Sequence, residues 1–157
     1  MKTLAFYFAC FVLTLHASAQ VSLLAQEVRN LVKRDHPEIG TDQKLIALSI
    51  WSDQDKESRA CNQAFEKAYT TYFNSKLKGG NKGLILVLLN REDLNEMAII
   101  TLGKDGIRHA LSYKLSDLKN TTKEFKQNIV YDSDNKIVLK DLNHEQIFDT
   151  IHSLITR

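Results

Sequence analysis

The chain has 157 residues, with 21 basic and 19 acidic side chains and a net charge of +2. This length suits one compact domain. The near-neutral balance argues against nucleic acid or an anionic membrane surface as a partner, because both attract proteins with a clear excess of basic side chains.

The first 19 residues have the pattern of a cleaved secretory signal peptide. Lys2 precedes a short apolar run that ends in Ala17-Ser18-Ala19, an A-x-A cleavage site. The run is shorter than the about 20 apolar residues that span a membrane, so a retained signal anchor is the less favoured alternative. Cleavage after Ala19 would leave residues 20–157 as one exported domain with a single thiol, Cys61, and therefore no internal disulfide.

Four elements are predicted in the first half of this domain: a helix, two strands and a second helix between the strands. Apolar residues at helical spacing between Val21 and Val32 predict a helix. This helix should end near Asp35, because Pro37 disfavours helical geometry at the residue before it. Residues 45–51 and 84–89 are apolar almost throughout, which is typical of strands covered on both faces. We expect these two strands to be parallel neighbours.

A second helix is predicted between those strands. Its apolar stripe consists of Cys61, Ala64, Phe65, Ala68, Tyr69 and Tyr72. Ser52, Asp53 or Asp55 is expected to cap its first turn, and Gly79-Gly80 to close it.

The second half is less regular. Residues 92–104 fit a helix, although Ile99 to Leu102 also suit a strand, and residues 105–124 have no clear period. Residues 129–131 and 136–140 flank a polar turn and predict an antiparallel hairpin. Asn143 and Gln146 form a capping-box pattern before a final amphipathic helix.

The segment from Ile50 to Asn62 resembles a signature of bacterial envelope thioredoxin-like proteins, Phe-Trp-Ala-Ser-Trp-Cys-x-x-Cys-Arg-x-x-Asn. Residues 128–142 independently resemble the hairpin of the same superfamily. The resemblance covers residues 44–157, with 90–125 poorly matched. It implies an α/β, thioredoxin-like fold with a central mixed sheet flanked by helices.

In that register the redox pair is absent. Trp51 is retained, but Asp55 occupies the position of the first cysteine and Ser58 that of the second. The resemblance also implies a cis-proline opposite the pair, where this chain has Lys126. Dithiol chemistry needs a low-pKa thiolate and a resolving cysteine, so Asp55 and Ser58 are expected to act as capping groups or as a remnant binding site.

Cys61 is the only other route to redox chemistry. It lies on the apolar stripe of the second helix, which is typical of a small core residue. The histidines His36, His109, His144 and His152 lack metal-ligand spacing and are expected to be solvated, so we expect neither a metal nor another cofactor.

The sequence therefore favours an exported, non-catalytic domain that binds an unknown protein or peptide through the former active-site face. A single-thiol redox or peroxide-sensing protein that uses Cys61 is the alternative, and an accessory of a redox-active partner is a third possibility. The predicted buried residues are Trp51, Phe65, Leu86, Val87, Ile129, Ile137 and Ile151.

Overall fold

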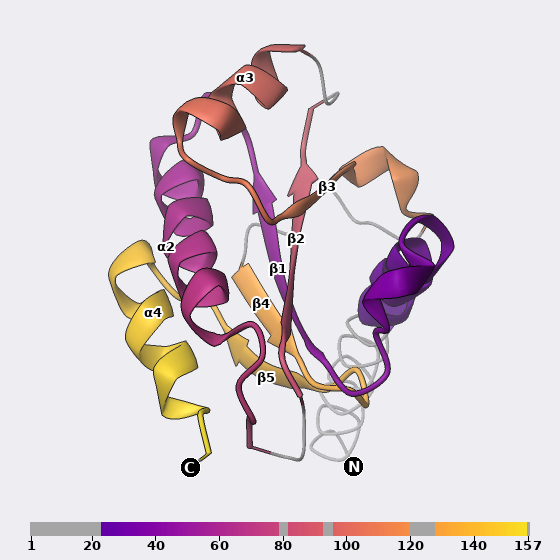
Figure 1. The fold of residues 1–157 in the computed structure, drawn as a ribbon. Helices are drawn as coiled ribbons and strands as arrows, with labels where there is room; N and C mark the ends of the chain where they lie inside the picture. The colour runs from indigo at the N-terminus through magenta and orange to yellow at the C-terminus, as the bar shows by residue number, and fades with distance from the viewer. Residues whose placement is uncertain (1–22, 79–81, 93–95, 120–127, 157) are drawn as a thin grey trace, which may run out of the picture.

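A five-stranded sheet forms the middle layer of the protein, and helices cover both of its faces (Figure 1). The computed structural model describes residues 23–78, 82–92, 96–119 and 128–156. The expected signal peptide and Lys126 lie outside these ranges.

The sheet has the strand order β3-β2-β1-β4-β5. Its strands are β1 (Leu45–Trp51), β2 (Leu84–Asn90), β3 (Leu111–Lys114), β4 (Asn128–Tyr131) and β5 (Ile137–Lys140). β1 and β2 are parallel neighbours, as predicted, with Leu45 opposite Leu84 and Trp51 opposite Asn90. β4 is antiparallel to β1, and β5 is antiparallel to β4, so the predicted hairpin is confirmed.

The helices divide between the two faces of the sheet. The N-terminal helix, described over residues 23–35, covers one face and is followed by a short 3-10 turn, η1 (Pro37–Ile39). The helices α2 (Lys56–Tyr72) and α4 (His144–Ser153) cover the other face (Figure 1). The remaining elements are α3 (Glu96–Lys104) and η2 (Leu115–Asp117).

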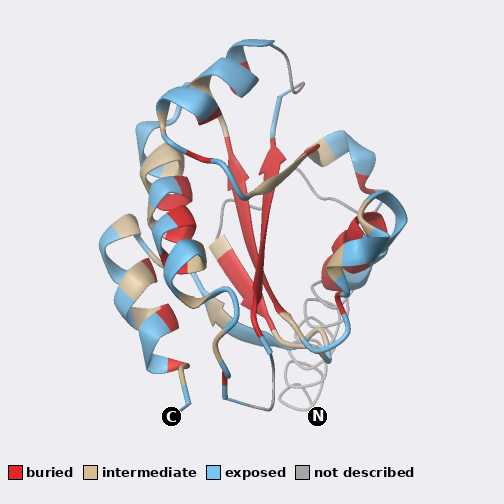
Figure 2. Ribbon diagram, in the orientation of Figure 1, coloured by how far each residue is buried: buried red, intermediate tan, exposed pale blue. Residues whose placement is uncertain are grey.

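Alternation of side chains along β1 and β2 gives each face its own core, because successive strand residues point to opposite sides. Leu45, Ala47 and Trp51 pack with α2 and α4, whereas Ile46 and Leu48 pack with the N-terminal helix. Figure 2 shows both strands buried along their length. The predicted burial of six core residues is confirmed: Trp51, Phe65, Leu86, Val87, Ile129 and Ile151.

The predicted burial of Ile137 is wrong. Its side chain is 39% exposed, and the neighbouring Val138 is 36% exposed. β5 is the edge strand of the sheet, so only β4 pairs with it and no layer covers the Ile137 side chain.

Two boundaries and one strand also differ from the predictions. α3 is a helix, but Arg91 and Glu92 precede it, and residues 93–95 lie outside the described residues. β3 was not predicted, because three of its four residues are only partly buried and the segment has no clear period. α2 ends at Tyr72, well before Gly79-Gly80.

Gly83 shapes the turn that leads from α2 into β2. Its φ of 91° lies in a region that L side chains rarely adopt, and a Cβ there would collide with the carbonyl oxygen of Phe73. That carbonyl accepts a hydrogen bond from the Leu84 N–H at 3.2 Å, which joins the end of α2 to the start of β2.

Candidate functional site

The C-terminal end of β1 leads directly into α2, as the sequence predicted. Asp55 is the N-cap residue of α2, and its side chain accepts a hydrogen bond from the Glu57 N–H at 3.1 Å. Ser52 has another role, because its Oγ donates to Glu92 Oε1 at 3.0 Å. Of the three candidate caps, the structure therefore selects Asp55.

Ser58 is part of the same helix start. Its hydroxyl lies 3.0 Å from the carbonyl oxygen of Asp55 and 3.3 Å from the N–H of Ser52. Within the described parts of the chain, its hydrogen bonds go to backbone groups. A serine needs a nearby base to act as a nucleophile, and these contacts provide none.

Cys61 lies one turn further along α2 and is only 2% exposed. Its Sγ is 3.8 Å from Glu57 Oε1 and 4.0 Å from the carbonyl oxygen of Leu142. Burial raises the pKa of the Cys61 thiol, and the negative charge of Glu57 adds to the shift, while a hydrogen bond with Asn128 opposes it. The thiol is therefore disfavoured as a thiolate, and the expectation of a core cysteine is confirmed.

A pocket of about 350 Å³ opens beside the start of α2. The sequence predicted three of its residues as candidates: Asp55, Ser58 and Cys61. The fold adds residues from the end of the sheet, from the first turn of α2 and from the loop before α4: Ile50, Glu57, Arg91, Asn128, Asp141, Leu142 and Asn143. Ile50 and Glu57 belong to the same segment as Asp55, but Arg91 and residues 128 and 141–143 are distant from it in sequence, so no single local motif could have joined them.

A hydrogen-bond network of two amides and a hydroxyl adjoins this pocket through Asn128, which lines it. Ser49 Oγ donates to Asn62 Oδ1 at 2.7 Å, and Asn128 Nδ2 donates to the carbonyl oxygen of Leu142 at 2.8 Å. Ser49 Oγ also lies 3.2 Å from Asn128 Oδ1, which joins the two pairs. A serine inside the apolar strand 45–51 was the sequence signal for this network.

His144 has a partner that the sequence did not predict. Its side chain is 42% exposed, as expected of a solvated histidine, but its Nδ1 lies 2.9 Å from Glu57 Oε1. This hydrogen bond lowers the pKa of Glu57 and raises that of His144. His109 is likewise paired, with Glu66 at 2.6 Å.

No cluster of three potential metal ligands occurs within residues 23–78, 82–92, 96–119 and 128–156. None of the helices in those ranges is both long and apolar enough to cross a bilayer.

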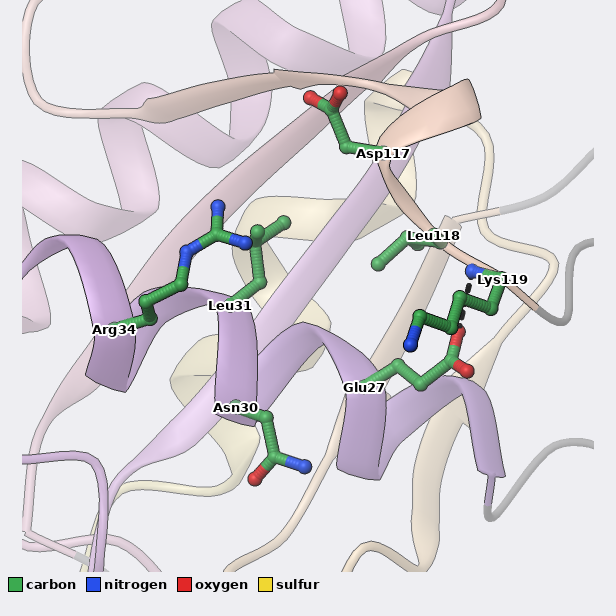
Figure 3. Close-up of a pocket in the computed structure, with 7 residues that line it drawn as sticks. All are labelled: Glu27, Asn30, Leu31, Arg34, Asp117, Leu118 and Lys119. Carbon is green, nitrogen blue, oxygen red and sulfur yellow. Dashed lines mark hydrogen bonds between the residues drawn. The ribbon is translucent and has the colours of Figure 1, made fainter.

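A second pocket, of about 310 Å³, lies on the opposite face of the sheet (Figure 3). It separates the N-terminal helix from the segment after β3, and the Lys119 N–H donates to Glu27 Oε2 across it at 3.1 Å. Arg34 and Lys119 balance Glu27 and Asp117, so the lining has no dominant charge.

The fold is similar to those of several solved thiol-disulfide oxidoreductases. The thioredoxin domain of a thiol-disulfide oxidoreductase from Bacteroides vulgatus is 15% identical with a TM-score of 0.59, over 74% of this chain and 82% of that one. A thiol:disulfide interchange protein from Bacteroides sp. is 17% identical with a TM-score of 0.58, over 73% and 75%. A secreted disulfide oxidoreductase from Mycobacterium tuberculosis is 9% identical with a TM-score of 0.52, over 73% and 84%.

The chain therefore has the thioredoxin-like fold, as the sequence resemblance predicted. No protein-family model and no curated protein matches the sequence. The chain has no Cys-x-x-Cys pair, because its only cysteines are Cys10 and Cys61.

Proposed function

We propose that this protein is an exported thioredoxin-like domain that binds a protein or peptide partner without dithiol chemistry. The pocket at the start of α2 is the proposed binding site. The observation that carries the proposal is the use of Asp55 and Ser58 as capping and backbone-bonded groups at the edge of that pocket. A carboxylate and a hydroxyl at these positions cannot form a mixed disulfide, but they can accept hydrogen bonds from a bound chain.

The pocket also supports this proposal by its composition. Leu142 and Ile50 supply apolar surface, while Asn128 and Asp141 supply polar groups that can orient a ligand. A largely preformed pocket with a few convergent polar groups is the usual form of a binding site.

Two measurements test this function. In the first, the purified protein is assayed for reduction of insulin disulfides, and we expect no turnover. In the second, partners captured from an envelope extract are identified and their affinities are measured with purified components. We expect Arg91→Trp to block binding, because the indole would fill the pocket.

Asn30→Trp is the matched control, since it places the same side chain in the pocket on the other face of the sheet. Robust insulin reduction by the unmodified protein would contradict the proposal. Equal affinity of both tryptophan variants for the partner would also contradict it.

A single-thiol function through Cys61 is the competing proposal. Its support is that Cys61 lies in the wall of the same pocket. Its burial and raised pKa count against it, because a reactive thiol needs exposure and thiolate character. Labelling of the native thiol distinguishes the two functions.

A further inference from the structure

The edge of β2 is open over its first three residues. β3 pairs with β2 from Val87 to Asn90, so within the described parts of the chain no strand lies beside residues 84–86 on that side of the sheet. Leu84, Ile85 and Leu86 are nevertheless buried, with 3%, 3% and 1% of their surface exposed. An open strand edge is a template on which another chain can pair.

Glu66 of α2 explains why β3 stops short. The backbone N–H groups of Arg108 and His109, which precede β3, donate to the Glu66 carboxylate at 3.1 and 3.3 Å. The His109 Nδ1 lies 2.6 Å from the same carboxylate. In the register of the β2–β3 ladder His109 would lie opposite Ile85, so its bonds to Glu66 leave that position of the ladder unfilled.

One carbonyl and one N–H group of β2 face the unfilled position. The Gly83 carbonyl accepts from the Leu45 N–H of β1 at 3.1 Å, whereas the next residue, Leu84, donates away from β1 to the carbonyl oxygen of Phe73. Backbone groups alternate in this way along a strand. The Leu84 carbonyl and the Leu86 N–H therefore point to the side that β3 leaves open. Buried backbone groups normally have a hydrogen-bond partner.

A pocket of about 210 Å³ is lined by the same residues 84–86. On one face of the sheet its lining includes Ile39 of η1, and Lys44 Nζ fixes η1 there by donating to the Ile39 carbonyl oxygen at 2.7 Å. On the other face the lining includes Tyr69 of α2, whose ring stacks on that of His109 with the centroids 5.5 Å apart. The pocket thus combines open backbone groups with an apolar and an aromatic wall.

We propose that this pocket binds an extended segment of a partner protein, which adds to the open edge of β2. The segment would donate to the Leu84 carbonyl and accept from the Leu86 N–H, as in β-strand addition. Its residue opposite Ile85 would point toward Ile39 and the two flanking residues toward Tyr69, because side chains alternate between the faces of a sheet. The segment should therefore have an aliphatic residue between two aromatic ones.

This site is separate from the pocket at the start of α2. That pocket adjoins the C-terminal end of β1, whereas residues 84–86 begin β2, the parallel neighbour of β1. The two pockets therefore lie toward opposite ends of the sheet. The inference goes beyond the proposed function and does not depend on it.

A short segment fits the open edge better than a second copy of the chain. A stable dimer buries about 800 Å² on each partner, which is more than three residues of a strand edge supply. Strand addition, by contrast, gains its affinity from main-chain hydrogen bonds over a short stretch.

The probe is the peptide acetyl-Tyr-Val-Tyr-amide, and the control is the same peptide N-methylated at its valine and its second tyrosine. The control keeps the side chains but loses the N–H groups that reach the Leu84 carbonyl in either strand direction. NMR titration of the purified protein measures both Kd values and follows the Leu86 amide signal. We expect the control to bind at least about tenfold more weakly, because a buried acceptor is left without a donor. The Leu86 N–H should also gain protection from hydrogen exchange when the probe binds.

Glu38→Trp should raise the Kd for the probe by about tenfold or more, because the indole would fill this pocket. Asn30→Trp is the matched control, since it places the same side chain in the pocket of Figure 3. It should leave the Kd within about twofold of the unmodified protein. Arg91→Trp, in the pocket at the start of α2, should do the same. Circular dichroism on all three variants checks that they fold.

No binding of the probe, equal binding of the two peptides, or an unchanged Leu86 amide signal would overturn the inference. A larger loss with Arg91→Trp than with Glu38→Trp would overturn it as well, because the peptide would then occupy the pocket at the start of α2. A dimer in sedimentation that Glu38→Trp abolishes would overturn it in favour of self-association.

Discussion

Glu57 on α2 and His144 on α4 are 87 residues apart in the chain, yet the His144 Nδ1–H donates to the Glu57 carboxylate at 2.9 Å. The His144 backbone N–H approaches the same carboxylate oxygen at 3.4 Å. A pair of hydrogen-bonded side chains thus joins the first turns of two helices on one face of the sheet.

This pair predicts a stability contribution that depends on pH. The hydrogen bond raises the pKa of His144, so its contribution is present below the ordinary histidine pKa of 6.5 and is lost as the pH rises through the raised value. It also lowers the pKa of Glu57, whose contribution is present above 4.5 and is lost as the pH falls through the lowered value. The pair should therefore stabilise the fold most between about pH 4.5 and 6.5.

Denaturant unfolding of the unmodified protein and of His144→Gln, from pH 4 to 9, measures this window. The difference between their unfolding free energies should be largest in the window and shrink above it. Glu57→Gln and the double variant complete a thermodynamic cycle. If the difference in unfolding free energy does not change with pH, the ionised Glu57–His144 pair does not contribute to stability.

The start of α2 should support a disulfide if cysteines are restored. In Asp55→Cys, the unpaired N–H groups and the positive end of the helix dipole should lower the thiol pKa below the usual value of about 8.5. Adding Ser58→Cys should give a pair that closes into a disulfide and gains reductase activity. The pKa is measured from the pH dependence of thiol absorbance or alkylation.

Both cysteine variants keep Cys61, which serves as an internal reference because burial raises the pKa of its thiol. Thiols at positions 55 and 58 that stay reduced under oxidising conditions, with an ordinary pKa, would show that the register with the thioredoxin-like signature is wrong.

Cys61 itself should be protected from thiol reagents in the native state. Because its side chain is 2% exposed, reaction should require unfolding, which makes labelling about a thousandfold or more slower than in denaturant. The measurement is the rate of reaction with a chromogenic disulfide at neutral pH, with and without denaturant. Rapid labelling of the native protein would support the single-thiol function instead.

Arg29 should be one of the most sensitive positions of the N-terminal helix. It is 4% exposed, and its guanidinium donates to Asn135 Oδ1 at 3.0 Å, to the carbonyl oxygen of Asp132 at 2.8 Å and to that of Thr41. Arg29→Met would remove all of these hydrogen bonds and leave only the backbone N–H groups of Asn135 and Lys44 donating to the carbonyl oxygens of Asp132 and Thr41. We expect a loss of about 2–5 kcal/mol in the free energy of unfolding.

Arg34 on the same helix is the matched control. It forms an exposed ion pair with Asp35, and such pairs contribute about 0–1 kcal/mol. Arg34→Met should therefore leave the unfolding free energy nearly unchanged. Similar losses in the two variants would mean that the bonds of Arg29 do not hold the hairpin turn against this helix.

The sequence determined the elements whose patterns are local. Apolar runs of β-branched and large residues specified β1 and β2, because a strand covered on both faces needs no polar alternation. Helical spacing of apolar residues likewise specified α2 and α4, and the capping box of Asn143 specified the start of α4, whereas the sequence left three candidate caps for α2.

Only the tertiary structure decided the features that depend on what lies opposite a residue. Ile137 lies in a segment whose apolar residues are typical of a core strand. Its place on the edge strand nevertheless leaves its side chain exposed. β3 has too weak a pattern to be recognised until β2 pairs with it. The pocket and the Glu57–His144 pair join segments that are distant in the chain, and such contacts depend on packing, which no local periodicity records.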